Sequence, residues 1–196
     1  MIPNAIVKQK FLKLEETRKN INKKIFLVTV ARFAKEKKGF DLIPKITKLL
    51  IERKIDFQWT IVGYNSKSIR AIKEMSNFEQ YFKYLDNIEN LDEKFFPHNN
   101  LIKIYKDNHL YLNLSRIESF GITIAEALAS GLPVITFDTK GGNELIKNNF
   151  NGIVVKNLSP ELFVDAIDQY IKSANLYEKH REKTISSIER YDLNSV

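Results

Sequence analysis

The 196-residue chain contains no cysteine, which excludes disulfides and thiolate metal sites. It also lacks an uninterrupted apolar run approaching the roughly 18 residues of a membrane-spanning helix, and it lacks an apolar N-terminal stretch. We therefore expect neither a membrane span nor a secretory signal, and we expect a cytoplasmic location. Only seven glycines and five prolines interrupt the chain, while 43% of the residues are apolar, so a sizeable core is expected.

The charge is unbalanced, with 31 basic and 24 acidic residues giving a net charge of +7. The basic residues are scattered among acidic ones rather than gathered with aromatic residues, which disfavours nucleic-acid binding. A lysine-rich, solvated surface is the simplest explanation. Peripheral contact with anionic lipids at the cytoplasmic face of a membrane, or attraction of an anionic substrate, is the functional alternative.

Short apolar runs alternate with segments of helical periodicity. The runs predict six strands, at Ile25–Val30, Phe57–Val62, Tyr81–Leu85, His109–Leu114, Val134–Phe137 and Gly152–Val155. Helices are expected over Leu42–Ile51, Asn99–Lys106 and Ile122–Gly131, after Ser159-Pro160, and as a surface helix in the tail from about Ser173, with a loop over residues 87–98. The pattern predicts an α/β fold with a Rossmann-like, doubly wound parallel sheet, formed by residues 1–196 as a single domain.

The sequence gives no reason to expect a metal or a cofactor. His98, His109 and His180 lie far apart without ligand-like spacing, no Asp-x-Asp motif occurs, and each histidine is expected to be an ordinary surface or half-buried residue. No Gly-x-Gly-x-x-Gly follows the first strand, which disfavours a dinucleotide site.

One segment combines the elements of a phosphate and sugar site. In SRIESFGITIAEALASGLPVITFD, which covers residues 115–138, Glu118 and Glu126 flank a Phe-Gly step, and Gly131 and Pro133 end the expected helix. A helix N-terminus preceded by glycine offers backbone N–H groups and a positive dipole end to a phosphate. A carboxylate one turn further in can accept hydrogen bonds from a sugar diol, so the segment predicts a nucleotide-sugar site.

This segment resembles the signature of retaining glycosyltransferase family 4, also called group 1, whose members have GT-B architecture. The resemblance rests on Ser115, Arg116, Glu118, Phe120, Gly121, Glu126, Gly131, Pro133 and Val134. It implies that the chain is the C-terminal half of such an enzyme, which binds a nucleotide-diphosphate sugar. The N-terminal domain, which binds a glycan or lipid-linked acceptor, is absent, so the isolated domain is expected to be inactive.

The resemblance also implies roles for residues at two strand ends. Arg32 and Lys38 after the first strand would neutralise the departing diphosphate in a metal-independent hexosyl transfer, with Lys37 as the local competitor of Lys38. Glu126 would bind the ribose hydroxyls, and Glu118 would support the sugar as positive charge develops.

Gly121, Ile122 and Thr123 would offer backbone N–H groups to the sugar donor, and Phe120 beside them is expected mainly to pack. Two departures prevent a transfer of base recognition: Gly63 is followed by Tyr64-Asn65 instead of the usual Gly-x-Gly, and Leu85-Asp86-Asn87 replaces a common glycine. The alternatives are a non-catalytic nucleotide-sugar-binding module and a nucleotide-sugar epimerase or hydrolase of the same architecture.

Overall fold

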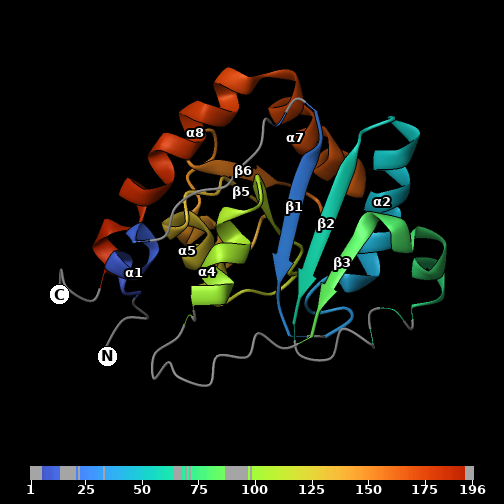
Figure 1. The fold of residues 1–196 in the computed structure, drawn as a ribbon, viewed down its shortest axis with the longest axis horizontal. Helices are drawn as coiled ribbons and strands as arrows, with labels where there is room; N and C mark the ends of the chain where they lie inside the picture. Colours follow the sequence, from blue (N-terminus) through green and yellow to red (C-terminus); the bar gives the residue numbers. More distant parts are fainter. Residues whose placement is uncertain are drawn as a thin grey trace.

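Figure 1 shows the computed structural model of the chain, which describes residues 6–13, 21, 23–32, 34–63, 68, 70, 72–86, 97 and 99–192. Six parallel strands form one sheet in the order β3-β2-β1-β4-β5-β6. The strands are β1 (Ile25–Val30), β2 (Phe57–Val62), β3 (Phe82–Leu85), β4 (Leu110–Asn113), β5 (Val134–Phe137) and β6 (Gly152–Val155). The predicted α/β, doubly wound parallel sheet is therefore confirmed.

Helices cover both faces of the sheet. The α-helices are α1 (Lys8–Leu12), α2 (Ile43–Glu52), α4 (Asn99–Lys106), α5 (Ile122–Ala129), α6 (Lys140–Leu145), α7 (Pro160–Lys172) and α8 (Ala174–Ser187). The 3₁₀ helices are η1 (Phe40–Leu42), η2 (Lys73–Tyr81) and η3 (Glu189–Tyr191). One core cluster joins the strands to α2, η2 and α7, and a second joins them to α1, α4 and α5.

The strands have the apolar composition that burial on two faces requires. Trp59 of β2 is fully buried, and its indole N–H donates to the Thr29 hydroxyl at 3.1 Å. That hydroxyl in turn donates to the carbonyl of Leu112 at 2.8 Å. The two bonds link the side chains of β2 and β1 to the backbone of β4, so the centre of the sheet is pinned by polar groups as well as by packing.

Most element boundaries agree with the sequence prediction. Four strands have the predicted bounds, while Tyr81 ends η2 and the residues flanking β4, His109 and Leu114, lie outside the strand. Helix α7 begins where Ser159 and Pro160 predict, because the Ser159 hydroxyl accepts a hydrogen bond from the Leu162 N–H at 3.2 Å. Most of the expected 87–98 loop lies outside the described residues.

The prediction of ordinary surface or half-buried histidines was wrong for His109 and His180, which are both buried, whereas His98 lies outside the described residues. The Nδ1 atom of the His109 ring accepts the backbone N–H of Phe26 at 2.9 Å, and the backbone N–H of His109 donates to the Phe26 carbonyl at 2.8 Å. The buried ring therefore satisfies the backbone N–H of Phe26 in β1. The Nδ1 atom of His180 lies 2.8 Å from the Tyr170 hydroxyl, and burial lowers the pKa of the imidazole.

The predicted surface helix in the tail is present as α8: most of its residues are exposed or half-buried, and one side of it packs on the domain. It contacts both α7 and α5, and it buries Tyr177, His180 and Thr184. Ile188 at its end is fully buried in the second core cluster. The buried side is hard to recognise in the sequence, because the many charged residues of the segment face outward and dominate its composition.

Candidate functional site

The sheet has its topological switch point between β1 and β4, because the chain runs outward from these neighbours in opposite directions. In open parallel sheets the crevice beyond the carboxyl ends of such strands is where ligands bind. A hollow of about 360 Å³ lies there. It is lined by Val30, Ala31 and Arg32 after β1, by Lys38, and by Glu118, Ser119, Phe120, Gly121, Ile122 and Thr123 between β4 and α5.

Two predicted site residues meet directly in this hollow. The Lys38 ammonium lies 2.8 Å from a carboxylate oxygen of Glu118, and their side chains are 25% and 14% exposed. Lys37, the alternative to Lys38, is exposed and does not line the hollow, while Arg32 lines it as an exposed residue. The structure therefore brings one cation and one carboxylate together across the switch point, with a second cation beside them.

Arg116, which follows β4, binds the segment around Lys38 on the other side of the switch point. Its guanidinium makes two parallel bonds of 2.7 Å to the Asp41 carboxylate, and its backbone N–H donates to the Lys37 carbonyl at 3.0 Å. Burial alone would raise the pKa of Asp41, but the bonds and charge of Arg116 lower it overall. Arg116 belongs to the sequence motif, whereas Asp41 carries no signal in the sequence, because their contact spans the switch point.

The same two segments touch through Gly39, which has a φ of 70°. A Cβ atom at this position would lie 2.0 Å from the carbonyl oxygen of Leu114. Only glycine allows both the left-handed conformation and this close approach of two backbones. The position of Lys38, the preceding residue, therefore depends on the absence of a side chain at residue 39.

We expect Gly39→Ala to lower the free energy of unfolding by at least about 2 kcal/mol, because the clash adds to the cost of a positive φ. It should also displace Lys38 from Glu118. Denaturant unfolding measures the first effect. Lys37→Ala is the matched control, since it shortens an exposed side chain of the same segment and keeps the carbonyl that accepts from Arg116. Equal stability of the two variants would contradict the prediction.

The N-terminus of α5 borders the hollow. Gly121 precedes the helix with a φ of 88°, and Ile122 and Thr123 form its first turn. The Tyr111 hydroxyl lies 2.7 Å from the Thr123 hydroxyl and 3.1 Å from the Val30 carbonyl. Since a phenol has one proton, donation to Val30 leaves Thr123 to donate to Tyr111. Donation to Thr123 instead leaves the threonine proton available to a ligand.

Glu126 does not line the hollow itself, but it lies three residues beyond Thr123 and thus on the same side of α5. It is only 6% exposed, and one of its carboxylate oxygens accepts a hydrogen bond from the Tyr105 hydroxyl at 2.9 Å. Burial raises the pKa of Glu126 to about 7, and the bond from Tyr105 opposes that rise. A buried carboxyl group with a pKa near 7, one helical turn from the residues that line a hollow, is typical of a functional position.

Phe120 both lines the hollow and packs, with its ring 5.3 Å from that of Tyr191 in an edge-on arrangement. The backbone around it is close to Gly141, where a Cβ atom would lie 2.8 Å from the Phe120 nitrogen. The backbone just before Gly121 is therefore in close contact with α6.

Comparison with known proteins shows the family of the chain. The profile of the family described as glycosyl transferases group 1 matches residues 12–187. The chain belongs to this family. Among its relatives is the GtfA subunit of a UDP-N-acetylglucosamine–peptide N-acetylglucosaminyltransferase from Streptococcus agalactiae. It is 29% identical over 184 residues, which cover 82% of this chain and 36% of that protein.

Two solved structures match the fold over most of this chain. The pneumococcal O-GlcNAc transferase GtfA, in complex with UDP and GlcNAc, matches with a TM-score of 0.71 and 25% identity over 87% of this chain and 33% of that one. The C-terminal domain of LpcC, a group 1 family protein from Francisella tularensis, matches with a TM-score of 0.73 and 17% identity over 96% and 99%. The chain thus spans well under half of the curated relative and has the fold of a C-terminal domain.

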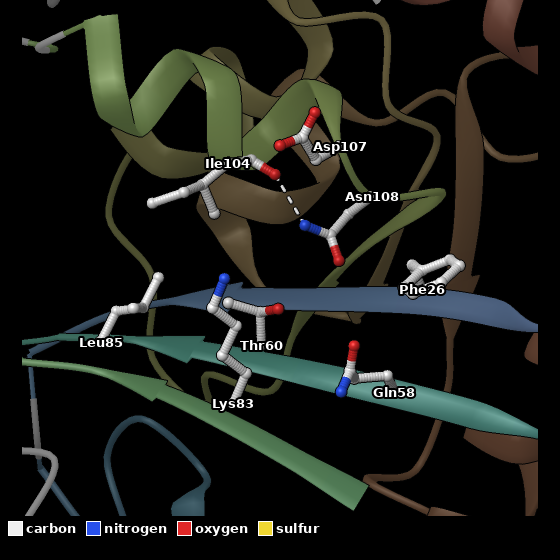
Figure 2. A pocket seen from close by; sticks show the side chains of 8 residues that line it. All are labelled: Phe26, Gln58, Thr60, Lys83, Leu85, Ile104, Asp107 and Asn108. Carbon is white, nitrogen blue, oxygen red and sulfur yellow. Dashed lines mark hydrogen bonds between the residues drawn. The ribbon is translucent and has the colours of Figure 1, made fainter. Parts of the chain in front are cut away.

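A second hollow of this group 1 domain, of about 310 Å³, lies on the sheet face beside α4. Figure 2 shows its lining from β1, β2, β3 and the end of α4, with Lys83 and Asp107 among the side chains. None of the predicted site residues lines it. Apart from Leu85 at the end of β3, its strand residues lie before the carboxyl ends of the strands, which makes the hollow at the switch point the candidate site of this family member.

Across the residues that the structure describes, no group of three or more His, Cys, Asp and Glu side chains could hold a metal ion. Within the same residues, no helix of this group 1 domain is both long and apolar enough to cross a bilayer.

Proposed function

We propose that this domain binds the sugar donor of a retaining, metal-independent hexosyltransferase, with a uridine-diphosphate sugar as the substrate. The observation that carries the proposal is the convergence of Lys38, Glu118 and the N-terminus of α5 on one hollow at the switch point, with Glu126 one turn deeper. The names of the two GtfA proteins, one a transferase from UDP-N-acetylglucosamine and the other bound to UDP, support the choice of uridine.

The diphosphate is expected to lie between Lys38, Arg32 and the first turn of α5. As the bond to the sugar breaks, the leaving diphosphate gains negative charge, so fixed positive groups stabilise the transition state more than the ground state. Lys38 acts as a point charge from a partly covered position, and Arg32 can add its planar fork from the rim. The backbone N–H groups at the start of α5 add the positive end of the helix dipole.

The ribose is expected to bind Glu126, whose ionised carboxylate can accept hydrogen bonds from two neighbouring hydroxyls. Glu118 lines the same hollow beside Lys38, and we expect the sugar to lie next to it, following the diphosphate. In the structure its carboxylate is ion-paired with Lys38. In the complex it would stabilise the positive charge that develops on the sugar.

We further propose that a second sheet domain supplies the acceptor, a glycan or lipid-linked chain, and closes the site. The support is that the aligned relatives are much longer than the matched part and that the fold matches an isolated C-terminal domain. These 196 residues alone should therefore bind the sugar donor with little or no transfer, because no second domain excludes water or orients an acceptor. Turnover by the isolated domain would contradict this part of the proposal.

The test is calorimetric titration with UDP, GDP, ADP and UDP-N-acetylglucosamine. We expect UDP to bind most tightly, and we expect Lys38→Ala and Glu126→Ala each to weaken its binding by about tenfold or more, since each removes a charged hydrogen-bonding group. Lys37→Ala is the control for general loss of positive charge and should bind like the wild type. Unchanged affinity in both site variants would overturn the site, and preference for another base would overturn the choice of uridine.

A further inference from the structure

The proposed ribose ligand has a partner from a different helix. Tyr105 lies in the last turns of α4, is fully buried, and donates its hydroxyl proton to the Oε2 atom of Glu126 at 2.9 Å. The tyrosine does not line the hollow at the switch point. Its hydrogen bond to Glu126 is the direct path by which it can influence a bound nucleotide.

We propose that Tyr105 is a positioning residue: it holds one carboxylate oxygen of Glu126 so that the other oxygen is presented to the ribose hydroxyls. The inference rests on the proposed role of Glu126 in nucleotide binding. If this is so, the preference for ribose over deoxyribose depends on the contact between α4 and α5 as well as on the residues that line the hollow.

Tyr105 is itself fixed, which is what such a role requires. Its ring meets that of Tyr111 edge-on, with the ring centres 5.9 Å apart, and it belongs to the core cluster that joins α4 to α5. A glutamate side chain has three rotatable bonds, and ordering it costs up to about 1.5–2 kcal/mol. If the carboxylate is already oriented by a rigid phenol, that cost falls on folding and not on ligand binding.

The electrostatics of the pair suit a hydrogen-bond donor that never becomes an anion. Burial, together with the neighbouring charge of Glu126, holds the pKa of Tyr105 well above its ordinary value, so the phenol keeps its proton. The bond also favours the ionised form of Glu126 against its burial, and the ionised form is the one that accepts from a diol. A neutral donor achieves this without placing a competing cation beside the site.

The experiment compares the affinities of UDP and 2′,3′-dideoxy-UDP, which differ only in the ribose hydroxyls. In the wild type, UDP should bind more tightly than the dideoxy compound. Tyr105→Phe should weaken UDP by about tenfold, the effect of one hydrogen bond to a charged group, and leave the dideoxy compound unchanged. The ratio of the two dissociation constants should therefore fall towards one.

The matched control is Tyr170→Phe, which removes the same atom from another fully buried tyrosine on the opposite face of the sheet. Tyr170 is hydrogen-bonded to His180, so this variant reproduces the loss of a buried bond far from the site. Its ratio of dissociation constants should stay at the wild-type value even if its stability falls. Tyr105→Met provides a second removal of the hydroxyl if the phenylalanine variant does not fold.

Glu126→Ala separates failure of this inference from failure of the proposed function. If Glu126→Ala leaves the ratio unchanged, Glu126 does not bind the ribose and both ideas are overturned. If Glu126→Ala abolishes the preference while Tyr105→Phe keeps it, only the positioning role is overturned. An equal weakening of both nucleotides by Tyr105→Phe would show a purely structural role and would also overturn it.

Discussion

Glu126→Gln is expected to remove a loss of stability that the wild type undergoes between about pH 4.5 and pH 7. Burial raises the pKa of Glu126 to about 7 in the folded state, above the 4.5 of an ordinary glutamate. While this carboxyl is protonated, its burial does not lower the free energy of unfolding. As the pH rises from 4.5 to about 7, the group loses its proton in the unfolded chain but keeps it in the folded one, so the free energy of unfolding falls. Between pH 5 and pH 8, the free energy of unfolding of the variant relative to the wild type should rise by about 2.5 kcal/mol.

Urea unfolding at several pH values measures this difference, and taking the difference cancels the contributions of every other titrating group. Glutamine keeps an acceptor for Tyr105, so the packing and the 2.9 Å bond can persist. Glu52→Gln, at an exposed position of α2, is the control for the same chemical change outside the site. A difference for Glu126→Gln that does not vary with pH would mean that this carboxyl is ionised in the folded state throughout the range. The variant should bind UDP poorly, which makes Glu126 a residue kept for function at a cost in stability.

Glu118→Gln and Lys38→Met are expected to change the affinity for UDP in opposite directions. The two side chains are ion-paired at 2.8 Å, so an incoming diphosphate competes with the Glu118 carboxylate for the Lys38 ammonium. Removing the carboxylate charge should strengthen UDP binding by about tenfold, whereas removing the ammonium should weaken it by about 10- to 100-fold. In the complete enzyme, Glu118→Gln should nevertheless slow sugar transfer.

Titration calorimetry at low and high salt tests this pair of variants. Screening should reduce the gain from Glu118→Gln, because part of it comes from relief of charge repulsion in a hollow open to solvent. Glu36→Gln is a matched control, since it removes an acidic charge from the segment that precedes Lys38 without lining the hollow. Weaker UDP binding by Glu118→Gln would show that this carboxylate contacts the nucleotide favourably and does not compete with it.

The fold could be predicted because its signals are local. Each strand is a short apolar run, and Ser159-Pro160 and Gly131-x-Pro133 mark helix boundaries through backbone chemistry that does not depend on distant contacts. The errors occurred where tertiary packing decides. His180 lies in a charged segment that reads as surface, yet it is buried because α8 contacts both α7 and α5.

The candidate site was predicted in part for the same reason. The segment from Glu118 to Glu126 is continuous in sequence, and the strand order places Lys38 opposite it. The contacts that hold these groups join residues far apart in the chain. Arg116 meets Asp41 across 75 positions, and Tyr105 of α4 meets Glu126 of α5. Neither pair has a spacing that a sequence pattern could reveal, because the geometry arises only when the sheet is assembled.

Trp59 gives the molecule a built-in optical reporter. It is the only tryptophan of the chain, it is fully buried on the α2 and α7 side of the sheet, and its indole N–H is bonded to Thr29. Its fluorescence should shift to longer wavelength only when water reaches the middle of the sheet, so the emission follows global unfolding. Because the indole does not line the hollow at the switch point, nucleotides can be added without quenching it by direct contact. Ligand-induced stabilisation of every variant can therefore be read from one intrinsic chromophore, without a dye or a label.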